Sequence, residues 1–294
     1  MTEYIYYPGC SLKGNAKHYE ESILPVFKEM GMKLEEMEDW NCCGATAYFS
    51  VDDTMAAAIC GRNLSIAERT GKNIVAPCAG CYLTLKKSNL FLKSEKNKAK
   101  KILGNLRDTG FEYSGKVEVK HPLEILIKDL GTEKIKAKVK QKLSGLRVVC
   151  YYGCQLVRPY TDFDDPDYPT TLDSIMEAIG ATPINYSSKT RCCGGSLTGT
   201  IEEVGLRLNY ILLKEAKKKG ADVMVTICPL SQFNLEILQS KIVHKYKEDI
   251  KMPILYFSQL VGLALGIPKE DLGFSRSIIS LKPMWEKLQN GGAR

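Results

Sequence analysis

The sequence lacks the features that would place this chain in a membrane or let it supply its own electrons. No stretch approaches the roughly 20 apolar residues that are needed to span a bilayer. The opening MTEYIYYPGC has neither a basic start nor an apolar segment, so we expect a cytoplasmic protein without a membrane span. The sequence also contains no dinucleotide-binding fingerprint, no ferredoxin-type run of cysteines and no flavin motif. Any redox chemistry would therefore need electrons from another protein.

Cysteine, in contrast, is abundant, and nine of the eleven cysteines form one pattern that occurs twice. The first copy has a single cysteine, an adjacent pair followed by glycine, and two further cysteines: Cys10, Cys42, Cys43, Cys78 and Cys81. The second copy keeps this order but has serine at the fifth position: Cys154, Cys192, Cys193, Cys228 and Ser231. In both copies 34 residues separate the pair from the next cysteine. The sequence therefore indicates an internal duplication around two thiolate-rich sites.

Strands and helices are expected to alternate in both halves. In the first half, the predicted strands YIYYPGC, LEEMEDWNCCG and NIVAPCAGC each lead into cysteines of the pattern. Such alternation predicts an α/β fold with two duplicated domains, each a small, mostly parallel sheet flanked by helices, related by pseudo-twofold symmetry. We place the domains at residues 1–143 and 144–274, followed by a tail at 275–294. Ligands of such sheets bind beyond the carboxyl ends of the strands, where the cysteine loops would meet.

The number of cysteines in each copy favours an iron–sulfur cluster over two alternatives. Tetrahedral zinc uses four ligands and needs no adjacent cysteines. A disulfide framework is unexpected in a reducing cytosol, and neighbouring cysteines rarely bridge each other. Iron–sulfur clusters are held by cysteine thiolates, usually four, so five indicate a larger or more open cluster.

The spacing of the motif resembles the cysteine-rich CCG domain. Two copies in one chain, with YPGCSLKG in the first and YYGCQLVRP in the second, are similar to the B subunit of the heterodisulfide reductases of methanogenic archaea. The resemblance covers nearly the whole chain. The motif is more specific to the domain than to the enzyme, because related domains occur in subunits of hydroxyacid oxidases, fumarate reductases and succinate dehydrogenases.

The resemblance implies a catalytic role. Each CCG domain of the family carries a noncubane 4Fe–4S cluster, and the disulfide of coenzyme M and coenzyme B is reduced to two thiols between the two clusters. It also implies that the nine repeat cysteines act as ligands and take part in catalysis. The implied partners are the iron–sulfur C subunit and the flavin A subunit of heterodisulfide reductase, and a small-molecule disulfide. Two other functions stay open: an electron-relay subunit of a hydroxyacid or succinate oxidoreductase, and a metal-dependent scaffold without turnover.

Ser231 is the departure from the family pattern. A serine oxygen is harder and far less acidic than a thiol. The second site could keep a noncubane cluster with a serine ligand or an open position, hold an ordinary four-cysteine cluster, or be labile. Loss of one thiolate would make the second cluster easier to reduce than the first.

Basic residues near the motif cysteines are candidates for binding an anionic substrate. They follow the first cysteine of each copy or precede the second pair: Lys13, Lys17, Arg158, Lys189 and Arg191. The net charge of +7 is concentrated in the lysine-rich segment between residues 86 and 142. Solvated helix faces or a docking face for an acidic partner fit this segment better than a nucleic-acid site.

Four residues outside the pattern are expected to have structural roles. Cys60 and Cys150 are replaced by tyrosine at the corresponding repeat positions, and buried free cysteine commonly acts as a small apolar residue. His121 and His244 are also expected to be structural. We expect His18 at the surface or at a helix cap, with protonation of a thiolate product as the alternative.

Overall fold

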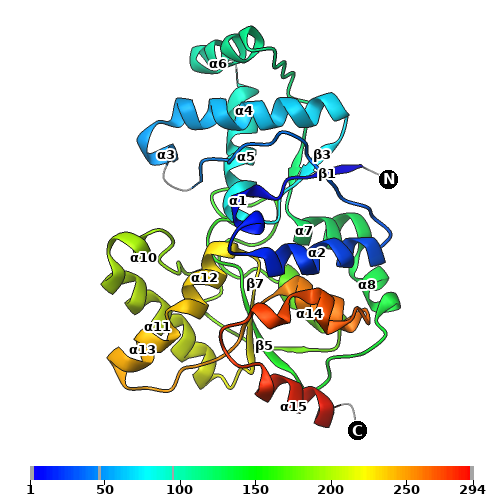
Figure 1. Cartoon of the computed structure of the whole chain (residues 1–294), viewed down its shortest axis with the longest axis vertical. Helices are drawn as coiled ribbons and strands as arrows, with labels where there is room; N and C mark the ends of the chain where they lie inside the picture. The colour runs from blue at the N-terminus through cyan, green and yellow to red at the C-terminus, as the bar shows by residue number, and fades with distance from the viewer. Residues whose placement is uncertain (1–2, 46–47, 95, 292–294) are drawn as a thin grey trace. The chain divides into compact units, whose positions relative to one another are not determined.

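The computed structural model describes residues 3–45, 48–94 and 96–291. Within them the chain divides into two compact units (Figure 1). The first unit consists of the described residues up to Asn15 together with Lys33–Pro122. The second unit consists of Ala16–Met32 together with the described residues from Leu123 onward.

The first unit is built on a parallel sheet with the strand order β2-β1-β3-β4. The two central strands are almost entirely buried, as expected for strands that are covered on both faces. The elements of the unit are β1 (Tyr4–Tyr6), α1 (Gly9–Lys13), β2 (Glu35–Glu36), α3 (Tyr48–Val51), α4 (Asp53–Thr70), β3 (Asn73–Val75), α5 (Ala79–Leu92), α6 (Asn97–Asp108) and β4 (Val119–Lys120). The short α7 (Pro122–Glu124) spans the junction with the second unit.

The second unit has a parallel sheet with the equivalent order β6-β5-β7-β8. Its elements are α2 (Lys17–Glu29), the π-helix η1 (Ile125–Leu130), α8 (Thr132–Lys138), β5 (Arg147–Tyr151), α9 (Thr171–Ala178), β6 (Thr182–Pro183), α10 (Leu197–Thr200), α11 (Glu202–Lys218), β7 (Val223–Thr226), α12 (Pro229–Ile237), α13 (Gln239–Tyr246), β8 (Ile254–Tyr256), α14 (Phe257–Ala264), the 3₁₀ helices η2 (Lys269–Leu272) and η3 (Phe274–Arg276), and α15 (Lys282–Gly291).

The register of the central strands repeats along with the strand order. Tyr6 of β1 pairs with Val75 of β3, and Cys150 of β5 pairs with Val225 of β7. These are the same two positions of the repeat in both copies. The predicted α/β fold with two duplicated parallel sheets is therefore confirmed at the level of backbone pairing.

Helix α2 belongs to the second unit although its sequence lies within the first copy. Its buried face includes Tyr19, whose ring stacks on the Tyr256 ring with centroids 4.1 Å apart and an interplanar angle of 5°. Ser22 and Ser258 share a hydrogen bond of 2.6 Å between their hydroxyl oxygens. Pro25, a residue type that usually kinks a helix or marks its start, lies inside the continuous helix. In Figure 1, α2 accordingly lies alongside α14.

The two units differ from the predicted division at residues 143 and 274. The apolar face of α2, with Tyr19 and Phe27 fully buried, completes the core of the second unit rather than that of the first. Residues 123–143 also join the second unit. The predicted tail at 275–294 contributes Arg276, which forms an ion pair of 2.6 Å with Glu21 of α2.

Candidate metal centres

The five cysteines of the first copy lie on three loops at one edge of the first sheet. Cys10 is in α1, directly after β1, and the Cys42–Cys43 pair follows β2. Cys78 is the N-cap residue of α5, and Cys81 lies in the first turn of that helix, directly after β3. All three loops follow the carboxyl ends of parallel strands, where the prediction placed them. We call this group the first centre.

Within the first centre the sulfur atoms pair closely. Cys43 Sγ lies 3.2 Å from Cys81 Sγ, and Cys42 Sγ lies 4.0 Å from Cys10 Sγ. The backbone N–H groups of Gly44 and Ala45 point at the sulfurs of Cys42 and Cys43, each with an N···S distance of 3.5 Å. Such N–H donors stabilise negative charge on sulfur. None of the eleven cysteines, all of which lie in the described part of the chain, forms a disulfide.

The second centre repeats this arrangement with Cys154, Cys192, Cys193, Cys228 and Ser231. Cys228 is the N-cap residue of α12, and Ser231 lies in its first turn, as Cys78 and Cys81 do in α5. Ser231 Oγ lies 3.4 Å from Cys193 Sγ, which matches the contact between Cys81 and Cys43 in the first centre. Serine thus takes the position of the fifth cysteine within the second unit.

A glycine before the first cysteine of each copy lets the cysteine loops approach each other. Gly9 has a φ of +65°, and a Cβ at this position would lie 2.9 Å from Cys81 Sγ. Gly153 has a φ of +67°, and a Cβ there would lie 3.5 Å from Ser231 Oγ. A side chain at Gly9 would therefore collide with a sulfur of the first centre, in addition to the backbone strain.

Hydrogen bonding favours the thiolate form of one cysteine in each pair. The pKa of the Cys43 thiol is lowered to about 3 by hydrogen bonds with the Cys42 and Cys81 thiols. The pKa of Cys192 is lowered to about 6, chiefly by a hydrogen bond with Cys154, with smaller contributions from the Gly194 N–H and Arg158. The thiolate is the form that binds metal ions.

Two buried tyrosines, which the sequence analysis did not single out, hold the loops that carry the cysteine pairs. The Tyr7 hydroxyl donates to the carbonyl oxygen of Asn41 at 2.7 Å, and the Tyr151 hydroxyl donates to the carbonyl oxygen of Arg191 at 2.6 Å. Both carbonyls belong to the residue just before a pair. The sequence did contain a signal for them, because both copies have tyrosine at the same repeat position, three residues before Cys10 and Cys154.

The two cysteines outside the pattern are both fully buried. Cys150 lies in β5, and burial raises the pKa of its thiol. Cys60 lies next to the first centre, where its thiol donates to the carbonyl oxygen of Cys43 at 3.2 Å. In the second unit the amide of Asn209 donates to the equivalent carbonyl of Cys193 at 2.8 Å. Cys60 therefore supports the loop of the first pair.

Two of the predicted basic residues line a pocket beside the second centre. Arg158 and Arg191 share a pocket of about 770 Å³ with Cys154 and Cys192. Both arginines are exposed, and Arg158 donates a hydrogen bond to the Thr190 carbonyl. Two cations thus stand beside two cysteines that are accessible to a small molecule.

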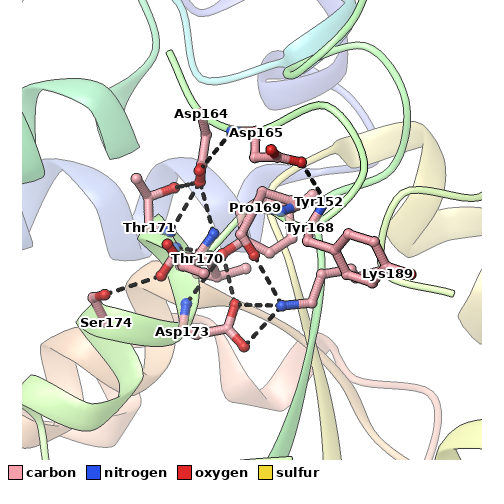
Figure 2. A network of polar contacts seen from close by, with 11 residues as sticks. Tyr152, Asp164, Asp165, Tyr168, Pro169, Thr170, Thr171, Asp173, Ser174 and Lys189 are labelled. Carbon is pink, nitrogen blue, oxygen red and sulfur yellow. Dashed lines mark hydrogen bonds and ion pairs between the residues drawn. The ribbon is translucent and has the colours of Figure 1, made fainter. Parts of the chain in front are cut away.

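Lys189, a third predicted basic residue, is not available to bind a small molecule. Its side chain is buried and binds the Asp173 carboxylate at 3.0 Å and the Pro169 carbonyl at 2.9 Å (Figure 2). The same figure shows the acidic loop of the second copy, in which Asp164 accepts hydrogen bonds from Thr170 and Thr171 at the start of α9. The charge of Lys189 is therefore balanced by Asp173 inside the second unit, and its side chain anchors this loop.

The remaining predicted basic residues are not among those that line this pocket. Lys13 follows Cys10 in α1 and forms an exposed ion pair of 2.6 Å with Glu36. Lys17 is exposed at the first position of α2, in the second unit. Of the five predicted basic residues, Arg158 and Arg191 are the two that line the pocket of the second centre.

His18 is buried, whereas the sequence predicted it at the surface or at a helix cap. Its side chain is 5% exposed, and its ring lies 4.9 Å from the Tyr256 ring between centroids. Burial lowers the pKa of His18 to about 4, an effect that the nearby Gln232 side chain partly counteracts. The neutral ring belongs to the packing of α2. His121 is also buried, with Nε2 2.8 Å from the Pro77 carbonyl oxygen.

The donor set of both centres fits an iron–sulfur cluster better than a single ion. Among the described residues, no group of three or more His, Cys, Asp and Glu side chains is arranged to hold one metal ion. Each centre instead spreads five donors over three loops, five sulfurs in the first and four sulfurs with one oxygen in the second, and backbone N–H groups are directed at the sulfurs. Hydrogen bonds to cluster sulfurs are a common feature of protein iron–sulfur sites.

Comparison with known proteins places both centres inside recognised domains. The family model for the CCG cysteine-rich domain matches residues 4–86 and 148–236. The chain is 33% identical to the 8-methylmenaquinol:fumarate reductase membrane anchor subunit of Wolinella succinogenes, over 94% of this chain and 97% of that protein. It is 30% identical to the B subunit of the ferredoxin/F420H2-dependent CoB-CoM heterodisulfide reductase of Methanosarcina acetivorans, over 95% of this chain and 94% of that protein.

A solved structure shares the fold. A hypothetical protein from Helicobacter pylori superposes with a TM-score of 0.77 at 15% identity, covering 95% of this chain and 52% of the other, so this chain spans about half of that protein. None of the described helices is long and apolar enough to cross a membrane.

Proposed function

The chain belongs to the CCG family of cysteine-rich domains, and from this premise we propose that it is a redox subunit whose two centres bind iron–sulfur clusters and together reduce a small-molecule disulfide. The observation that carries the proposal is the meeting of each copy's donors at the carboxyl edge of its own sheet, five thiols in the first and four thiols with Ser231 in the second. The similarity to the B subunit of a CoB-CoM heterodisulfide reductase supports the CoM–CoB disulfide as substrate. The resemblance of the cysteine motif implies a noncubane 4Fe–4S form for each cluster.

The reaction consumes two electrons and two protons. The S–S bond of the substrate breaks, and each sulfur gains one electron and one proton to give two thiols. Bound clusters would supply the electrons one at a time. The cysteines would hold them, with Ser231 as an oxygen ligand or as the neighbour of an open position. Tyr7 and Tyr151 fix the loops of the two pairs through the carbonyls of Asn41 and Arg191.

The arginine pocket supports an anionic substrate. Arg158 and Arg191 stand beside Cys154 and Cys192, and arginine binds carboxylate, phosphate and sulfonate groups through charge-assisted hydrogen bonds. They would orient the anionic end of a disulfide at the second centre. Lys13 and Lys17 stay candidates for the other end, and Lys13 would first have to leave Glu36.

An electron-relay function is the second candidate, and the similarity to a fumarate reductase subunit favours it. In that function both centres would pass electrons onward without binding a disulfide. Either function requires partner subunits, because the sequence carries no cofactor motif for collecting electrons. We propose an iron–sulfur subunit of the C type as direct donor and a flavin subunit of the A type upstream.

An anaerobic assay separates the two functions. Purified chain is mixed with reduced viologen as electron donor and the CoM–CoB disulfide as acceptor, and oxidation of the viologen is followed. We expect viologen oxidation that depends on the disulfide and yields two thiols per disulfide consumed. Protein that contains reduced clusters but is not reoxidised by any disulfide would favour the relay.

Loss of either pocket arginine should weaken substrate binding more than turnover. A charge-assisted hydrogen bond contributes about 1.5–3 kcal/mol. Because both arginines are exposed, we expect the lower end of this range, about a tenfold rise in KM for Arg158→Gln and for Arg191→Gln. Iron content should stay unchanged. The matched control is Arg107→Gln, an exposed arginine in the last turn of α6. If KM is unchanged in both pocket variants, these arginines do not bind the substrate.

A further inference from the structure

The two copies also differ at a buried position whose side chain, in the second copy, approaches a cysteine of the pair. Thr84 in α5 and Asn234 in α12 both lie six residues after the third-loop cysteine, Cys78 or Cys228. Thr84 Oγ1 donates to Gly80 O within its own helix at 2.7 Å. The Asn234 amide instead bonds outside its own helix, donating to the Gly195 carbonyl at 3.0 Å. The two positions therefore play different roles although they are equivalent in the repeat.

The same amide group of Asn234 also approaches Cys193. Its Nδ2 lies 3.8 Å from Cys193 Sγ and 3.5 Å from the Cys193 carbonyl oxygen. Asn234 is 1% exposed, so no bulk water competes for these contacts. Because the amide nitrogen carries two hydrogens, one can serve Gly195 while the other points toward Cys193.

Other neutral polar groups surround Cys193 where the first centre has thiols. Ser231 Oγ lies 3.4 Å from Cys193 Sγ, and Asn209 Nδ2 lies 2.8 Å from the Cys193 carbonyl oxygen. The equivalent neighbours of Cys43 are the thiols of Cys81 and Cys60. The second centre is therefore poorer in sulfur and richer in side-chain hydrogen-bond donors than the first.

A donor that points at a cluster thiolate stabilises the more negative, reduced state of the cluster. Reduction potentials of iron–sulfur clusters depend on net charge and on hydrogen bonds to the sulfurs. We infer that Asn234 is a positioning residue that makes the second centre easier to reduce than the first, so that electrons collect beside the Arg158–Arg191 pocket. This inference rests on the proposed binding of iron–sulfur clusters. It adds the order in which the two clusters are reduced.

The experiment is an anaerobic redox titration of each centre, followed by electron paramagnetic resonance. The wild-type chain is compared with Asn234→Thr, which installs the first-copy residue, and with the reciprocal Thr84→Asn. To assign the signals, Asn234→Thr is also measured in a Cys43→Ala background, where only the second cluster is expected. The matched control is Asn89→Thr, because Asn89 is buried in α5 and donates to the Val117 carbonyl at 2.8 Å.

We expect the second cluster of the wild type to be reduced at the higher potential. Asn234→Thr should lower the ratio of reduced to oxidised second cluster about fivefold at a fixed potential, the effect of one typical hydrogen bond. Iron content should not change, and Asn89→Thr should move neither centre. Thr84→Asn should shift the first cluster in the opposite direction.

Three results would overturn the inference: equal potentials of the two wild-type clusters, an unshifted second cluster in Asn234→Thr, or loss of the second cluster in that variant. The last result would mean that Asn234 only holds the loop through Gly195. Absence of iron and acid-labile sulfide from the wild-type chain would instead refute the proposed function itself.

Discussion

Anaerobically purified protein in which Cys43 is replaced by alanine should contain about half of the wild-type iron and acid-labile sulfide. Each centre should hold about four irons and four sulfides. Cys43 Sγ lies 3.2 Å from Cys81 Sγ and receives the Ala45 N–H, so its loss removes a proposed cluster ligand from the middle of the first centre. The second centre draws all its donors from the second unit and should keep its cluster. Metal analysis and electron paramagnetic resonance provide the measurement.

Cys60→Ser is the matched control for this loss. Cys60 is as buried as Cys43 and touches the Cys43 carbonyl, but its sulfur is not part of the repeated pattern. Serine keeps a hydrogen-bond donor at this position, so both clusters should persist. Stoichiometric zinc with negligible iron in the wild type would contradict the assignment of both centres. Equal loss of both clusters in Cys43→Ala would show that the centres do not assemble independently.

Tyr19→Ala should destabilise the second unit by about 3–5 kcal/mol, the usual cost of deleting a large buried aromatic side chain. Tyr19 is fully buried and stacks on Tyr256. Because the total stability of a domain is about 5–15 kcal/mol, the change would consume a large part of it. Denaturant unfolding measures the loss, and hydrogen exchange locates it. Amides of β8 and α14 should lose protection, although the substitution lies within the first sequence copy.

Tyr168→Ala is the control for this prediction. Tyr168 is also a tyrosine of the second unit but is 71% exposed, so its removal should change stability by no more than about 0.5 kcal/mol. If Tyr19→Ala instead weakened protection in β1 and β3, α2 would stabilise the first unit, and the division into units would need revision.

The sequence predicted the parallel sheets and the position of the cysteine loops because both depend on local patterns that occur twice. The central strands of both sheets, β1, β3, β5 and β7, are each followed within four residues by a cysteine, and parallel strands bring such loops to one edge. The placement of Ser231 followed from the same repeat spacing. Its contact with Cys193 reproduces that of Cys81 with Cys43.

Contacts between distant segments were not predictable in this way. The apolar spacing in α2 shows that Tyr19 and Phe27 are buried, but not against which segment they pack. The sequence shows that Lys189 is a basic residue. Its ion pair with Asp173 depends on how the acidic loop folds, which the sequence does not show. Tyr7 and Tyr151 are consistent with ordinary buried residues at strand ends, and their role emerged only from the hydrogen bonds of their hydroxyls.

The docking of α2 also has a consequence for the order of events during synthesis. The hydroxyls of Ser22 and Ser258 that meet in the second unit are separated by 236 positions in the chain. At about 5–20 residues per second, a ribosome needs on the order of ten to fifty seconds to make the intervening segment. During this time the surface that will bury Tyr19 and Phe27 has not yet been made, while Cys10 and Cys42 on either side of α2 have already emerged. The nascent chain therefore presents an apolar segment between two thiols before its packing surface exists, and we expect chaperones and cluster-delivery proteins to act at this stage.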